Sequence, residues 1–100
     1  MAALDLLGRR WALRVLWELR GGPLGFRALQ AACDDMSSSV LRDRLRELVD
    51  AQLVGRTEGD RYELTPLGAD LRRSLAPLSR WAQRWDAEVN GGWPPPPPDA

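Results

Sequence analysis

The segment DDMSSSVLRDRLRELVDAQLV, residues 34–54, decides the fold, because it joins a turn, a helix start and a two-sided helical pattern. Its first three residues predict a tight turn. Ser37 is the natural N-cap of the helix that follows, since its hydroxyl can accept a hydrogen bond from an unpaired amide of the first turn. On a helical wheel, Leu41, Leu45, Leu48 and Gln52 cluster on one side, and the leucines are expected to face the core.

The opposite side of this helix carries small polar and charged residues: Ser39, Asp43, Arg46 and Asp50, with Arg42 and Glu47 beside them. Small side chains near a helix N-terminus let the backbone approach the major groove of DNA, and arginine can read guanine or bind phosphate. The layout is therefore typical of a DNA-recognition helix. It is also typical of a mixed-charge helix that contacts only water, and this segment alone leaves that alternative open.

Two helical stretches are predicted before this segment. Apolar residues recur every three or four positions over 3–20, and Gly8 divides the stretch into a short helix and a longer one that starts near Arg9. Gly-Gly-Pro at 21–23 ends the longer helix. A shorter helix over Phe26–Cys33 comes next, and with the serine-headed helix it completes a helix-turn-helix.

A small β-hairpin is predicted directly after the serine-headed helix. Residues 53–57 and 61–65 read as two strands around a turn centred on Gly59. A hairpin at this place would be the wing of a winged helix. Arg56 and Arg61 would then be available for contacts to the DNA backbone.

A long helix is predicted to follow the hairpin. Thr65 can cap it and the proline after Thr65 fits the first helical position, so the helix should run over Pro66–Val89, with a kink or a restart at Pro77. Residues 91–100 contain five consecutive prolines and are expected to form a disordered or polyproline II tail. The predicted fold is mainly α with a small β-hairpin: a winged helix-turn-helix over 1–90 with a long C-terminal dimerisation helix.

The composition argues against several classes of function. Fourteen basic residues, all arginine, balance fourteen acidic ones, so any DNA binding must come from the local arrangement of charge. The chain has no histidine and one cysteine, which leaves no disulfide, no His/Cys metal cluster and no histidine general base. Serines without a His or Lys partner make a poor nucleophile, so we expect neither an enzyme nor a cofactor.

No leader or membrane segment is expected either. The N-terminus lacks a basic region followed by a long apolar run, and no apolar stretch approaches the roughly twenty residues that span a bilayer. A soluble cytoplasmic protein without a membrane partner is the expectation.

Six short motifs between Ala3 and Ala87 stand in a characteristic order: LDLLGRRWALRVLWEL, GGPLGFRAL, MSSSVLRDRLREL, LVGR, YELTPLGADL and LAPLSRW. Their order and spacing resemble those of the HxlR-type winged-helix regulators, relatives of the MarR group. The resemblance implies a dimeric bacterial transcription regulator that binds double-stranded DNA at a near-palindromic site. Together with the helical wheel and the wing, it marks candidate DNA-binding residues: Ser37, Ser38, Ser39, Arg42, Asp43, Arg44, Arg46, Arg56, Arg61 and Arg27.

Several residues depart from the family pattern. Gly25 stands where many members have a basic residue, and the wing is several residues shorter than usual. Arg44 flanks the core on the wheel, so we expect a phosphate contact or a structural ion pair rather than base reading. Asp43 would repel phosphate and either accepts from a cytosine amino group or is tolerated. Some members use a Cys-Pro ahead of the first helix as a sensor, whereas Cys33 is expected to be a small core residue.

Tryptophan is abundant, with five in 100 residues, and most of them fall on the first and last helical stretches. A monomer would expose an apolar patch there, and pairing with a symmetry mate in a two-fold dimer would cover it. The same side chains could instead line a slot for a small, flat aromatic effector. The candidate residues for this dimer interface or effector pocket are Leu7, Trp11, Trp17, Leu78, Trp81 and Trp85.

Two functions are compatible with these observations. The first is a sequence-specific DNA-binding transcriptional regulator that acts as a homodimer and responds to an effector. The alternative is a winged-helix protein-interaction module that has lost DNA binding, which the neutral net charge, Asp43, Gly25 and the short wing permit.

Overall fold

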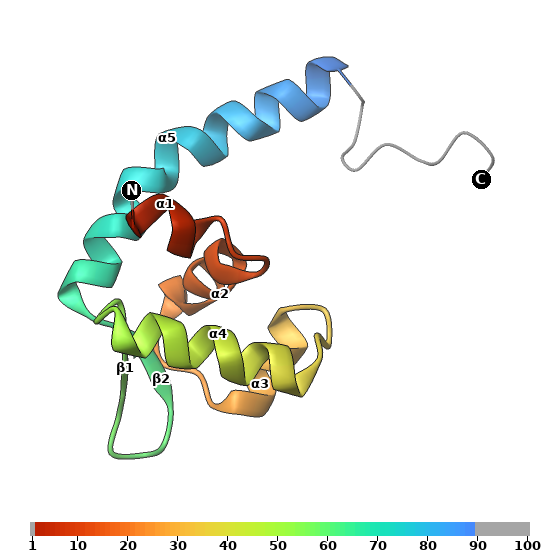
Figure 1. Cartoon of the computed structure of the whole chain (residues 1–100). Coiled ribbons are helices and arrows are strands. Elements are labelled where there is room, and N and C mark those ends of the chain that lie inside the picture. Colours follow the sequence, from red (N-terminus) through yellow and green to blue (C-terminus); the bar gives the residue numbers. More distant parts are fainter. Residues whose placement is uncertain (1, 90–100) are drawn as a thin grey trace.

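The structure, a computed structural model, describes residues 2–89 of the chain (Figure 1). Helices dominate it, and a two-stranded antiparallel hairpin precedes the last helix. The elements in chain order are α1 (Ala2–Leu7), α2 (Ala12–Glu18), the short 3-10 helix η1 (Leu19–Gly21), α3 (Phe26–Ala32), α4 (Ser38–Asp50), β1 (Val54–Arg56), β2 (Tyr62–Leu64) and α5 (Pro66–Val89). This order confirms the predicted winged helix-turn-helix. The predicted tail, residues 91–100, lies outside the described residues.

The hydrophobic core lies where α2, α3, α4 and β1 meet. Its best buried large side chains come from all four elements and from η1: Val15, Leu16, Leu19, Leu29, Leu41, Leu48 and Val54. Leu41, Leu45 and Leu48 of α4 face this core as the wheel predicted. Gln52, which the wheel placed on the same side, lies beyond the end of α4 at Asp50, in the following turn with a φ of 63°.

The second helix begins later than the sequence predicted, at Ala12 rather than near Arg9. Trp11 stands at its N-cap with a φ of 77°, in the left-handed region that bulky residues rarely occupy. The Trp11 ring is half-buried and packs against the core. Burial of a large aromatic side chain offsets the backbone cost, so the turn expected at Gly8 extends as far as Trp11, over residues expected to be helical from Arg9.

The hairpin is shorter than predicted by one residue at each end of each strand. Its register pairs Val54 with Leu64 and Arg56 with Tyr62. Leu24, in the link before α3, adds a bridge to Tyr62 through two backbone hydrogen bonds of 3.0 and 2.8 Å. The wing is therefore tied to the start of the helix-turn-helix as well as to its end.

The start of α5 docks on the turn after α4. The Thr65 hydroxyl accepts from the Gly68 amide at 3.0 Å and donates to the Gln52 carbonyl at 2.6 Å, which confirms Thr65 as the cap. Gly68 is buried, and a side chain there would meet the Leu53 backbone. Pro77 lies inside α5, so the helix does not restart there. Figure 1 shows α5 bending part-way and its outer half extending away from the other helices.

Within residues 2–89, no helix is both long enough and apolar enough to cross a bilayer.

Candidate nucleic-acid interface

The N-terminal end of α4 is open to solvent. Ser37 caps the helix, because its hydroxyl accepts from the Val40 amide at 3.5 Å. The hydroxyls of Ser37 and Ser39 lie 3.0 Å apart, and Ser38 is exposed beside them. The short side chains leave the first turn of α4 accessible to a flat surface or a groove.

Two arginines extend this open surface along α4. The Arg42 guanidinium lies 5.1 Å from the centre of the Phe26 ring on α3, an arrangement that fixes its direction. Arg46 is 71% exposed and pairs with Asp43 at 3.5 Å. An exposed ion pair of this kind contributes little, so Arg46 can exchange Asp43 for another anion.

The wing brings a third guanidinium to the same place. Arg56 lies 5.1 Å from the Tyr62 ring centre and pairs with Asp60 across the hairpin turn. A hollow of about 320 Å³ lies between α4 and the hairpin, lined by Arg42, Leu45, Arg46, Val49, Arg56 and Tyr62. Three guanidinium groups and no carboxylate border this hollow, which suits a phosphate group.

Two further candidates flank this surface. Arg61 is exposed directly before β2, and its backbone amide donates to the Thr57 hydroxyl at 3.2 Å. Arg27 is exposed in the first turn of α3. Both side chains are accessible to a DNA backbone on either side of the surface formed by α4.

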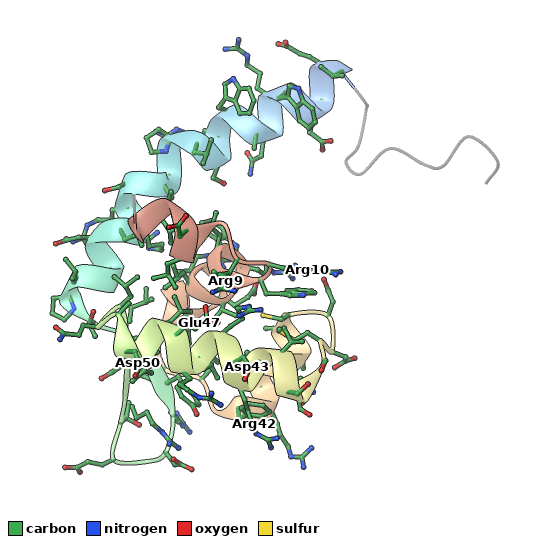
Figure 2. All side chains as sticks on the ribbon, viewed as in Figure 1. Arg9, Arg10, Arg42, Asp43, Glu47 and Asp50 are labelled. Carbon is green, nitrogen blue, oxygen red and sulfur yellow. The ribbon has the colours of Figure 1, made fainter. Side chains whose placement is uncertain are left out.

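Arg44 has a different environment from the other arginines of α4. Its Nε donates to the Arg10 carbonyl at 2.8 Å and its guanidinium pairs with Glu47 at 2.5 Å, while Arg9 approaches Glu47 from the other side at 3.6 Å. Arg44 is only 17% exposed, so of its two expected roles the structure contains the ion pair. Figure 2 shows Arg9 and Arg10 on one side of α4 and Arg42 on the other.

Sequence reasoning missed this second cluster. Arg9 and Arg10 form a visible basic pair before α2, but nothing local indicates that the Arg10 carbonyl meets a residue 34 positions later. The cluster fixes the α1–α2 turn against the middle of α4 and therefore fixes the rotation of α4 about its own axis.

Carboxylates occupy the part of α4 that points toward this turn. Glu47 is half-buried by its two arginine partners, and Asp50 is exposed. Figure 2 shows Asp43, Glu47 and Asp50 following one another along the helix. Along α4, the serines lie at the N-terminal end, Asp43 lies between Arg42 and Arg46, and Glu47 and Asp50 lie toward the C-terminal end.

Cys33, at the end of α3, is a core residue as predicted. Its side chain is 0% exposed. Burial raises the pKa of the Cys33 thiol, and the nearby Arg14 guanidinium opposes that shift. A buried, protonated thiol reacts slowly with oxidants and electrophiles.

The six candidate residues for the dimer interface or effector pocket do not form one cluster. Trp81 and Trp85 stack on the outer half of α5, with ring centres 6.2 Å apart. Leu7 lines a hollow beside the first half of α5, and Trp11 packs on the core. Trp17 and Leu78 share a hollow between α2 and α5, and Trp81 and Trp85 line another hollow on α5 itself.

Comparison with known proteins supports the winged-helix geometry. The model of the HxlR-like helix-turn-helix family matches residues 6–90. The HTH-type transcriptional regulator YvaP of Bacillus subtilis is 33% identical over 92 residues, covering 83% of this chain and 82% of that protein.

Two solved structures resemble the whole domain. Quinone-bound YodB from B. subtilis has a TM-score of 0.75 and 30% identity, covering 83% of this chain and 92% of that one. A possible HxlR family transcriptional factor from Thermoplasma volcanium has a TM-score of 0.79 and 30% identity, covering 86% of this chain and 83% of that one. The chain therefore belongs to the HxlR-like helix-turn-helix family of transcriptional regulators.

Proposed function

We propose that this chain binds a specific DNA sequence as a homodimer and regulates transcription from a near-palindromic operator. The observation that carries the proposal is that Arg42, Arg46 and Arg56 of the wing line one hollow beside the open serine end of α4. Neutral net charge is compatible with it, because Asp43 is the one carboxylate of α4 beside these arginines, whereas Glu47 and Asp50 lie toward the C-terminal end of the helix.

Each part of this surface has a role in the proposed complex. Ser38, Ser39 and Arg42 enter the major groove, where an arginine can bind guanine through two hydrogen bonds. Arg46 and Arg56 hold one phosphate in the hollow between α4 and the wing. Arg27 and Arg61 contact the flanking backbone, and Arg44 orients α4 from within the domain.

The outer half of α5 supplies the dimer interface. Trp81 is 53% exposed and Val89 is 63% exposed, on the part of α5 that extends beyond the core. An apolar helix face of this kind is covered when a second copy pairs with it. A two-fold pair would place the two α4 helices in successive major grooves, about 34 Å apart. Sedimentation should give a dimer for the wild type and a monomer for Trp81→Glu.

An effector response completes the proposal. The similar YodB structure is described as quinone-bound, and this chain carries apolar hollows beside α5 where a small aromatic molecule fits. The effector would act on the equilibrium between DNA-bound and free protein.

Fluorescence anisotropy with labelled duplexes from the region upstream of the protein's own gene tests DNA binding. Arg42→Ala and Arg46→Ala should each weaken specific binding by roughly 5- to 150-fold, the range set by one good base or phosphate contact. Arg73→Ala is the matched control, because Arg73 is an exposed arginine on α5 that pairs with Asp70.

Two results would contradict the proposal in different ways. Equal binding by Arg42→Ala, Arg46→Ala and the wild type would refute these residue roles. Absence of duplex binding by the wild type at low salt would favour the protein-interaction module instead, for which the acidic residues Asp43, Glu47 and Asp50 on α4 are the supporting observation.

A further inference from the structure

An apolar hollow separates α2 from the first half and middle of α5. Its volume is about 350 Å³, within the usual range for small-molecule sites. The residues that line it are Leu13, Arg14, Leu16, Trp17, Arg72, Leu75, Leu78, Ser79 and Ala82. Its walls are leucines and one indole ring, and its two charged groups are both arginines.

The two arginines of this hollow differ in one respect. Arg14 is fully engaged, because it contacts Glu18 at 3.1 Å, Asp34 at 3.2 Å and the Ala32 carbonyl at 2.8 Å. Arg72 is half-buried, and its guanidinium has no hydrogen-bond or ion-pair partner among residues 2–89. A partly desolvated guanidinium without an anion is costly, so Arg72 is suited to receive one.

The aromatic wall is held in place before any ligand arrives. Arg20 lies 4.0 Å from the Trp17 ring centre and donates to the Trp17 carbonyl at 3.0 Å. A fixed indole offers a flat surface at little entropic cost.

We propose that this hollow binds a planar aromatic carboxylate, with its ring between Trp17 and the leucines and its carboxylate on Arg72. The inference rests on the effector response proposed above and names its chemical class and its site. Charge complementarity favours this occupant over an apolar helix of a second copy, since such a helix would bury the Arg72 guanidinium without a partner.

Arg14 connects the hollow to the DNA-binding surface. It lines the hollow and at the same time holds Ala32 and Asp34, the end of α3 and the turn that leads into α4. A carboxylate in the hollow attracts Arg14 and competes with Asp34 for it. Occupancy should therefore loosen the turn before α4 and lower the affinity for DNA.

Isothermal titration calorimetry with 2-naphthoate and its neutral analogue 2-naphthamide tests the binding site. Wild type and Arg73→Gln should bind naphthoate more tightly than naphthamide. Arg72→Gln should lose naphthoate affinity by roughly 10- to 100-fold, the effect of one charge-assisted, forked contact, and should bind naphthamide as the wild type does. Ala82→Phe, at an exposed helical position that borders the hollow, should block both compounds.

Equal naphthoate affinity in Arg72→Gln and wild type, or no binding of either compound by wild type at millimolar concentration, would overturn the inference. Fluorescence anisotropy with labelled duplex, in the absence of naphthoate and naphthamide, separates a failure of this inference from a failure of the proposed function. Arg72→Gln should then bind the duplex like the wild type. At a naphthoate concentration that saturates the wild type, wild type and Arg73→Gln should release DNA, whereas Arg72→Gln should retain it. Retention of DNA by all three proteins would refute the regulatory role of Arg14.

Discussion

The packing of Gly68 leads to a sharp prediction about how α5 is held on the DNA-binding unit. In Gly68→Ala the added Cβ would overlap the Leu53 carbonyl oxygen and lie 3.0 Å from its carbonyl carbon. Both atoms belong to backbone, so no side-chain rotation can relieve the contact. The start of α5 and the turn after α4 must separate, which strains the hydrogen bond from the Thr65 amide to the same Leu53 carbonyl.

The size of the effect follows from opposing contributions. Alanine gains about 1 kcal/mol over glycine inside a helix, whereas overpacking against backbone costs about 3 kcal/mol and one weakened hydrogen bond about 1 kcal/mol. The net loss of unfolding free energy is about 3 kcal/mol. For a domain of this size, that lowers Tm by roughly 12–24 °C.

Thermal and urea unfolding followed by circular dichroism measure this loss. Gly21→Ala is the matched control, because the same chemical change there meets nothing within 4 Å and should shift stability by less than about 1 kcal/mol. If Gly68→Ala unfolds at or above the wild-type temperature, the close approach of α5 to Leu53 does not exist in solution.

Three other predictions concern single contacts. Thr65→Ala should cost about 1 kcal/mol in urea unfolding, because it removes the cap of α5. Arg44→Gln should cost about 1–2 kcal/mol by the same assay, whereas the exposed Arg46→Gln should stay within about 0.5 kcal/mol of wild type. Burial raises the pKa of Cys33, so the folded state keeps the thiol protonated at a pH where the unfolded state begins to lose that proton. The free energy of unfolding should therefore decline as pH rises above the unfolded thiol pKa of about 8.5. Cys33→Ala should lack that decline in urea unfolding.

The sequence predicted the secondary structure well where a local pattern, such as leucine spacing or a helix cap, determines it. The spacing of Leu41, Leu45 and Leu48 sets the buried side of α4, and Ser37 and Thr65 mark two helix starts that the structure confirms. Such signals act within one helical turn and can be read from neighbouring residues.

Other features depend on contacts between distant residues and left no local signal. Trp11 adopts a left-handed backbone only because its ring packs on the core, and Leu24 pairs with Tyr62 across almost forty positions. A helical wheel shows which side of α5 is apolar but not what each residue meets. Trp81 and Trp85 therefore stack with each other but lie apart from Trp11 on the core and Trp17 on α2. Nothing in the sequence indicated that Arg72 borders a hollow between α2 and α5.

The separation of α5 into a docked beginning and a projecting end has an evolutionary consequence. If two copies join through the projecting end, the distance between half-sites depends on its length and bend, while the bases that are read depend on α4. One additional turn in the outer part of α5 would displace the partner by roughly 5.4 Å without altering any side chain that faces a base. Descendants of this chain could thus acquire operators of new spacing and operators of new sequence by mutations in separate parts of the gene.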